Sequence, residues 1–129
     1  MRALPLLSLA LALSALPGGP APQAAGECAR DAMLVFDGSG SMGEVGHDPT
    51  APTRIMDARR AVRDAMPDIA PYRRVGLLTY GPGGTHACSG IDLRFAPRAE
   101  AGAAVVAGIE TLAPGGLTPL ADSVAAAAE

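Results

Sequence analysis

Two uninterrupted apolar stretches of strand length constrain the fold of this chain more than any other feature. They are Ala32–Phe36 and Val75–Tyr80. Neither stretch alternates between apolar and polar residues, and such runs are typical of parallel strands that are covered on both faces of a sheet. The sequence therefore predicts an α/β domain, with Ala32–Phe36 as its central strand.

The segment between these strands predicts an amphipathic helix over residues 54–66. Its apolar positions recur at helical spacing, Thr53 is the expected N-cap, and Pro67 is the expected end. Three arginines on its other side are expected to face solvent: Arg59, Arg60 and Arg63.

Three further elements follow the second apolar strand. Ile91–Phe95 alternates apolar with charged residues, which predicts a half-exposed edge strand in a hairpin with the second strand. Pro97 is expected to open a second helix, and Thr118–Pro119 a third with Leu120 and Val124 facing inward. The apolar stripe expected on the second helix is Ala101, Val105, Ile109 and Leu112. This order predicts a mainly parallel, doubly wound, Rossmann-like sheet with an antiparallel edge strand.

The first 25 residues resemble a secretory signal peptide. Arg2 precedes the apolar run Leu4–Leu16, and a Gly/Pro break and small residues follow it. The run has about 13 residues, fewer than the ~20 that a membrane-spanning helix needs. We therefore expect a secreted or periplasmic mature protein without a membrane span.

Export bears on the two cysteines, Cys28 and Cys88. A disulfide is the usual state of a cysteine pair in an oxidising compartment. The expected strands, however, separate the two residues by about the length of one strand, which is ~20 Å. The sequence leaves open whether they pair with each other.

Composition excludes some classes of function. The chain has 10 basic and 13 acidic residues, a net charge of −3, and only four aromatic residues, none of them Trp. A nucleic-acid interface depends on a basic surface, and a base-stacking platform depends on exposed aromatic rings. We therefore expect no nucleic-acid partner.

The candidate chemistry follows the first strand directly, in Asp37-Gly38-Ser39-Gly40-Ser41. A carboxylate and two hydroxyls at alternate positions of a curled turn converge on its inner side. Such oxygen ligands suit a hard divalent cation, with Mg²⁺ expected and Mn²⁺ or Ca²⁺ as other possibilities.

This segment resembles the Asp-x-Ser-x-Ser metal-ion-dependent adhesion motif of the von Willebrand factor A (VWA) domain family. Gly116-Leu117-Thr118-Pro119-Leu120 resembles the family's second element, a Thr on a loop before a helix. The resemblance covers about residues 29–129 and implies that Asp37, Ser39, Ser41 and Thr118 bind the metal. It also implies a binding module rather than an enzyme, whose metal takes a carboxylate from a partner protein. The family's third element, an Asp after a further strand, has no counterpart here, so we expect the domain to be incomplete at its C-terminal side.

A second interpretation is a dinucleotide-binding oxidoreductase, because Gly38-x-Gly40-x-x-Gly43 also follows the first strand. That fingerprint requires a helix to begin at its third glycine, whereas residues 44–53, with two prolines, intervene here. The binding module is therefore the favoured interpretation.

Overall fold

The computed structural model describes residues 31–86 and 88–129. Within them the elements follow the expected order of strand, helix, strand, strand, helix, helix. They are β1 (Asp31–Asp37), the short 3₁₀ helix η1 (Gly40–Gly43), α1 (Arg54–Ile69), β2 (Arg74–Tyr80), β3 (Ile91–Arg98), α2 (Gly102–Glu110) and α3 (Leu120–Ala127). Residues 1–25, the expected signal peptide, and Cys28 lie outside the described residues.

The three strands form one mixed sheet in the order β1-β2-β3. β1 runs parallel to β2, and β3 pairs antiparallel with β2, as the hairpin prediction required. β1, the expected central strand, lies at the edge of this three-stranded sheet. Within the described residues β1 has only β2 as a neighbour, so residues 32–35 are only partly buried, whereas residues 75–80 of β2 are all buried.

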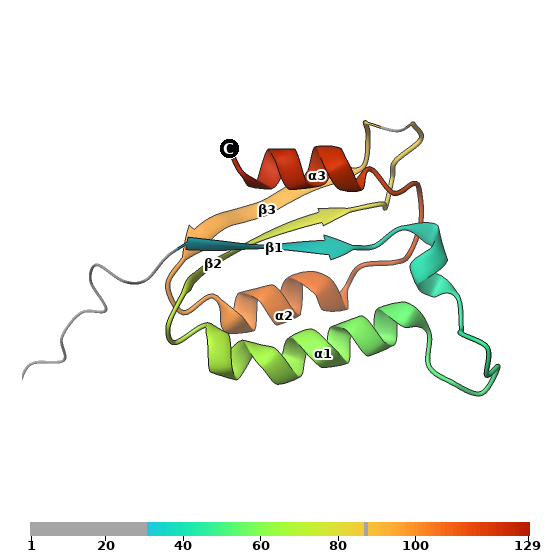
Figure 1. Cartoon of the computed structure of the whole chain (residues 1–129), viewed down its shortest axis with the longest axis horizontal. Coiled ribbons are helices and arrows are strands. Elements are labelled where there is room, and N and C mark those ends of the chain that lie inside the picture. Colours follow the sequence, from blue (N-terminus) through green and yellow to red (C-terminus); the bar gives the residue numbers. More distant parts are fainter. Residues whose placement is uncertain (1–30, 87) are drawn as a thin grey trace, which may run out of the picture.

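The sheet carries helices on both faces. Figure 1 shows α1 and α2 together on one face and α3 on the other. The core lies between the sheet and the α1–α2 layer and contains Phe36, Leu77, Val105 and Ile109, each at most 4% exposed. The predicted apolar stripe of α2 is buried throughout, because its spacing matches the helical period. The described residues thus form a mixed α/β fold.

Both prolines that were expected to mark helix ends lie inside elements. α1 continues through Pro67 to Ile69, because a proline in the last turn removes only one backbone hydrogen bond of the helix. Pro97 lies in β3, and α2 begins only at Gly102. An edge strand tolerates proline because one of its sides needs no backbone donors.

The predicted inward face of α3 is also wrong. Leu120 and Val124 are each 53% exposed, whereas Ser123 is fully buried and donates its hydroxyl to the Pro119 carbonyl at 2.8 Å. Because Ser123 is small, α3 can approach the sheet closely at this point. The helix therefore turns its larger apolar residues outward.

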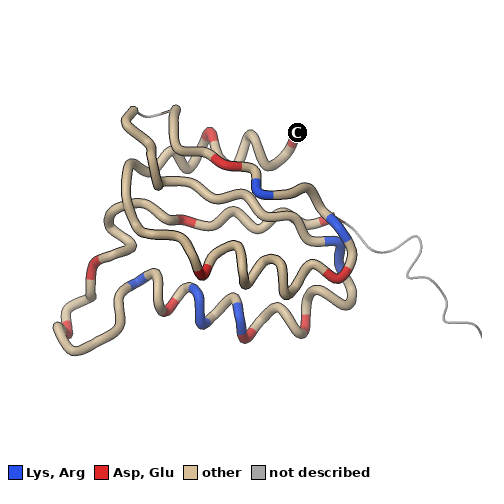
Figure 2. The backbone as a smooth tube through the Cα atoms, turned by 180° about the vertical axis from the view of Figure 1, so that it is seen from behind, with Lys and Arg blue, Asp and Glu red and all other residues tan. Residues whose placement is uncertain are grey.

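The arginines of the helices lie along α1, as Figure 2 shows from behind. Arg60 pairs with Asp57 on its own helix at 3.5 Å, and Arg63 pairs with a glutamate at the end of α2. Arg59 departs from the solvent-exposed prediction. It is half-buried and donates to the carbonyls of Ile109, at 2.9 Å, and Leu112, so it holds the C-terminal end of α2 against α1.

Candidate functional site

The Asp-x-Ser-x-Ser segment begins where β1 ends. The Gly38 amide donates to the Tyr80 carbonyl at 2.8 Å, which extends the β1–β2 pairing by one residue. The Ser39 amide then turns back and donates to Asp37 Oδ1 at 2.7 Å. This local bond forms an Asx turn that bends the chain into η1.

The turn brings three oxygen-bearing side chains together. Ser39 is 1% exposed, Asp37 is half-buried and Ser41 is exposed. The hydroxyls of Ser39 and Ser41 lie 3.5 Å apart. The three predicted ligands of this segment therefore form a compact group that opens to solvent at Ser41.

The loop that precedes α3 lies against this turn. The Gly40 amide donates to the Gly116 carbonyl at 3.2 Å, and the Gly115 amide donates to the Gly38 carbonyl at 2.9 Å. Thr118 follows two residues after this contact and is exposed. Two segments about 80 residues apart in the sequence thus meet at the carboxyl end of β1.

A third loop, which begins at Gly81 after β2, packs against the other two loops, and we call their meeting point the three-loop junction. Glycine is required there at Gly116, before α3, and at Gly81. A Cβ on Gly116, whose φ is +70°, would lie 1.8 Å from the Gly81 carbonyl oxygen. A Cβ on Gly81, whose φ is +113°, would lie 2.4 Å from the Ser39 amide nitrogen. Backbone packs directly on backbone here, so side chains at either position would separate the loops. The glycine-rich segment after the second apolar run was visible in the sequence, but its contact with the other two loops was not.

Tyr80 is a residue of this region that the sequence analysis missed. It ends β2, is paired in register with Asp37, and is 4% exposed. Burial, then the negative charge of Asp37 and a side-chain hydrogen bond with it, raise the pKa of Tyr80 to about 12. The only sequence signal was that both strands end at polar residues.

Arg54 holds the turn and the loop that follows it by hydrogen bonds. Its Nη1 atom donates to the Ser41 carbonyl at 3.0 Å and to Glu44 Oε2 at 3.1 Å, and its own amide donates to the Glu44 carbonyl. These bonds close the base of the exposed loop 44–53. Within this loop, hydrogen bonds from Thr50 lower the pKa of Asp48.

Cys88 lies in the loop between β2 and β3 and is exposed. A hydrogen bond with Asp122 of α3, followed by that residue's negative charge, raises the pKa of the thiol. The β2–β3 loop therefore approaches α3 near the junction. Cys28, the other cysteine, lies outside the described range, so the structure does not test whether it pairs with Cys88.

The donor set at this junction is one carboxylate and several hydroxyls. In residues 31–86 and 88–129, no group of three or more His, Cys, Asp or Glu side chains is arranged to hold a metal ion. A cation at this site would therefore be bound by Asp37 and hydroxyl oxygens, which suit hard ions such as Mg²⁺ rather than thiophilic metals.

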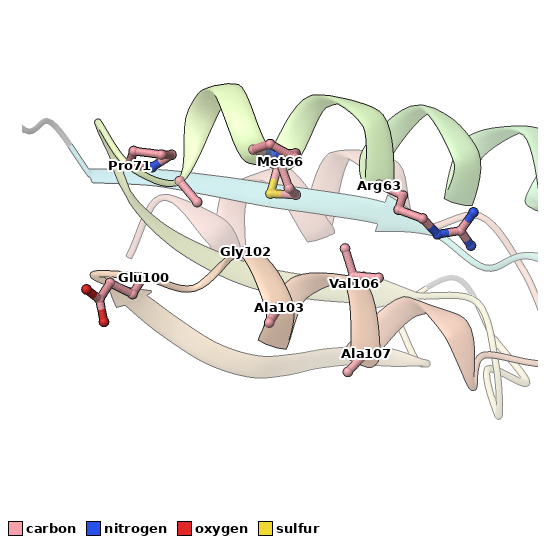
Figure 3. A pocket seen from close by; sticks show the side chains of 10 residues that line it. Arg63, Met66, Pro71, Glu100, Gly102, Ala103, Val106 and Ala107 are labelled. Atoms are coloured by element: carbon pink, nitrogen blue, oxygen red, sulfur yellow. The ribbon is translucent and has the colours of Figure 1, made fainter.

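A separate hollow lies at the opposite end of the α1–α2 layer. An apolar groove of about 670 Å³ lies between the C-terminal part of α1 and the start of α2. Figure 3 shows the side chains that line it. Met66 and Val106 line it, and Arg63 and Glu100 lie at its edges. It shares no residue with the three-loop junction and is not part of the candidate site.

Comparisons with known proteins bear on the fold alone. No protein-family model and no curated protein matches this sequence. A crystal structure of an uncharacterized membrane-spanning protein from Vibrio fischeri matches 77% of this chain, with a TM-score of 0.54 and 22% sequence identity. The match covers 47% of that protein, so this chain spans about half its length. In the part of this chain that the structure describes, no helix has the length and apolar character needed to cross a bilayer.

Proposed function

We propose that this chain is an exported binding module of the VWA type, which holds a divalent cation and presents it to a carboxylate of a partner protein. The ligands would be Asp37, Ser39, Ser41 and Thr118. One observation carries the proposal: the paired backbone hydrogen bonds between residues 38–40 and 115–116, which hold the Thr118 loop beside the Asp-x-Ser-x-Ser turn.

The chemistry of the donors supports Mg²⁺, with Mn²⁺ or Ca²⁺ as alternatives. Mg²⁺ prefers six oxygen ligands and keeps several waters when the protein supplies few carboxylates. Asp37 would supply one negative charge and the hydroxyls neutral oxygens. The cation would therefore retain positive charge and exchangeable waters, and a carboxylate from a partner could replace one of them.

The arrangement of the elements supports a Rossmann-like, doubly wound topology as the finer description of the fold. β1 and β2 are parallel and connected through α1, and helices cover both faces of the sheet. In open α/β sheets of this kind, ligands bind beyond the carboxyl ends of the strands. The proposed metal site lies at that edge.

The dinucleotide-binding alternative receives less support. A pyrophosphate site needs the N-terminus of a long helix directly after the glycines. Gly40–Gly43 instead forms η1, and α1 begins only at Arg54, beyond an exposed loop. The Asp37 carboxylate would also lie beside the phosphates and repel them.

Export is part of the proposal and rests on residues 1–25, whose apolar run and small-residue end are typical of a cleaved signal. An extracellular or periplasmic location suits a module that binds other proteins through a divalent cation.

Isothermal titration calorimetry of the chain with MgCl₂ and MnCl₂ tests the function. We expect one cation site, lost in Asp37→Ala and retained in the matched control Asp64→Ala, which removes an exposed carboxylate from α1. NAD⁺ should not raise the melting temperature. Cation binding that survives Asp37→Ala would refute the metal assignment, and saturable NAD⁺ binding would favour the alternative.

A further inference from the structure

β1 and β3 are the two edge strands of the sheet within the described residues, and they differ in how well they are protected from further pairing. β3 carries Asp92 and Arg94, contains Pro97, and pairs with β2 in an irregular register. Charges, prolines and bulges are the features by which natural edge strands avoid pairing with another strand. Residues 32–36 of β1 have no charge and no proline. We infer that the free edge of β1 is a dimer interface, which pairs antiparallel with β1 of a second copy of this chain.

The free edge of β1 presents the backbone groups of alternate residues. The Gly38 amide donates to the Tyr80 carbonyl at 2.8 Å, so the backbone of Gly38 faces β2. Because successive residues of a strand direct their N–H and C=O groups to opposite sides, the backbone groups of Met33, Val35 and Asp37 face away from β2. Within residues 31–86 and 88–129 no strand pairs with them. A strand from a second copy would supply the missing hydrogen bonds.

α3 adds apolar side chains on the same side of the molecule. The helix packs over β1 and β2, runs in the opposite direction to β1, and buries Ser123 against the sheet (Figure 1). Because crossovers such as β1–α1–β2 are right-handed, Leu120 and Val124 then project from the flank of α3 that lies toward the free edge of β1. Each of these two side chains is 53% exposed. The free edge and the flank of α3 therefore form one apolar surface.

A second copy covers this surface more fully than an extended peptide does. A single added strand would pair with β1 but would leave the flank of α3 exposed. A copy related by a twofold axis perpendicular to the sheet brings β1 against β1 and α3 beside α3 on the same face, so the apolar side chains of the two copies meet.

The size of this side of the molecule suits a stable dimer. It is about 23 Å long along the seven residues of β1 and about 30 Å high across the helix, sheet and helix layers. Its area of about 700 Å² is close to the ~800 Å² that each partner contributes to a standard interface.

Charge selects the register of the pairing. Centring it on Leu34 would place Asp31 opposite Asp37 of the second copy, and like charges directly opposite each other are destabilising. Centring it on Val35 separates the two carboxylates and places Leu34 opposite Phe36 of the second copy. This register uses the outward backbone groups of β1 and does not depend on the proposed cation.

The first test is sedimentation equilibrium of the whole chain over a range of concentrations, with a reductant present so that the cysteines form no cross-link. We expect a reversible equilibrium between monomer and dimer. Leu120→Glu places a charge in the interface of both copies and should raise the dissociation constant of the dimer by about 100-fold or more. Leu93→Glu is the matched control, because Leu93 is 55% exposed on β3, and its dimer should dissociate like that of the wild type. A wild type that is monomeric at every concentration, or equal effects of the two substitutions, would overturn the inference.

Hydrogen exchange at single amides tests the strand pairing without a substitution. The amides of Met33, Val35 and Asp37 should exchange more slowly as the protein concentration rises, because carbonyls of the second copy accept them. The amides of Leu34 and Phe36 face β2 and serve as internal controls, whose protection should change less with concentration. A Val35 amide that is protected equally at all concentrations would show that another part of the same chain covers the edge. A Val35 amide that is never protected would show that the edge stays open, and either result would overturn the inference.

Discussion

Gly116 offers the sharpest test of how the three loops fit together, because an adjacent glycine serves as its control. Gly116 has a φ of +70°, and a Cβ there would lie 1.8 Å from the Gly81 carbonyl oxygen. Gly115 has no such restriction, since a Cβ at that position meets nothing within 4 Å. Gly116→Ala and Gly115→Ala therefore add the same methyl group one residue apart, in one crowded and one open position.

The magnitude follows from two contributions. An alanine in the left-handed region costs about 1–2 kcal/mol. The overlap with Gly81 forces the loops apart, which breaks the hydrogen bonds Gly40–Gly116 and Gly115–Gly38, each with a net contribution of about 1 kcal/mol. We expect Gly116→Ala to lower the free energy of unfolding by about 3–4 kcal/mol in total, whereas Gly115→Ala should change it by less than about 1 kcal/mol.

Urea unfolding followed by circular dichroism measures both variants against the wild type at one pH and temperature. If the free energy of unfolding falls with urea concentration at the same slope in all three proteins, the variants unfold to similar denatured states. If Gly116→Ala and Gly115→Ala have the same unfolding midpoint, the close approach of the loops at residue 116 does not contribute to stability. The proposed positioning of Thr118 would then lose its structural basis.

Two further measurements test packing and electrostatics elsewhere in the chain. Arg59→Met removes two charge-assisted hydrogen bonds at the end of α2 and should lower the free energy of unfolding by about 2–3 kcal/mol. The control Arg60→Met removes an exposed ion pair and should change the free energy of unfolding by less than about 1 kcal/mol. Equal effects of the two substitutions would contradict the role of the Arg59 hydrogen bonds. Spectrophotometric titration of Tyr72→Phe should give Tyr80 a pKa near 12, above the value of about 10 for free tyrosine. Because the folded-state pKa is the higher one, the stability from neutral Tyr80 is complete below about pH 10 and is lost as the pH rises toward 12. Ionisation near 10 in the folded protein would contradict the burial of Tyr80 beside the negative charge of Asp37.

The elements and their order could be predicted because apolar spacing determines which segments become strands and helices. The hairpin of β2 with β3 and the buried stripe of α2 are confirmed on this basis. Which strand is central was not predictable in the same way. β1 and β2 have similar apolar runs, and only their neighbours in the sheet distinguish them.

The prolines and α3 show where local signals fail. Pro67 and Pro97 have the same local chemistry as helix-ending or helix-starting prolines, but tertiary packing accommodates one in a last helical turn and the other on an edge strand. In α3, the apolar pattern favoured Leu120 and Val124 as the inner face, yet the close approach of the helix to the sheet selects the small side chain of Ser123.

The candidate site was predictable only in part. Asp37, Ser39 and Ser41 form a group because they share one turn, which is a local property of the sequence. The position of Tyr80 beside Asp37 depends on strand register, and the need for glycine at position 81 depends on contact between distant loops. Neither is encoded locally in the sequence. The metal, its partner and the family resemblance stay predictions.

The meeting of residues 38–40 with residues 115–116 has a consequence for how the chain acquires its structure. This contact closes a long stretch of polypeptide, and the entropy of that closure must be overcome before the contact contributes anything. A ligand held by both segments binds the native chain and has no equivalent site in the unfolded one. Its binding energy therefore adds to the equilibrium in favour of folding, by about 2.7 kcal/mol at a hundredfold excess over its dissociation constant. Under the proposed function, the ionic composition of the compartment in which the chain folds would itself determine how much native protein is present.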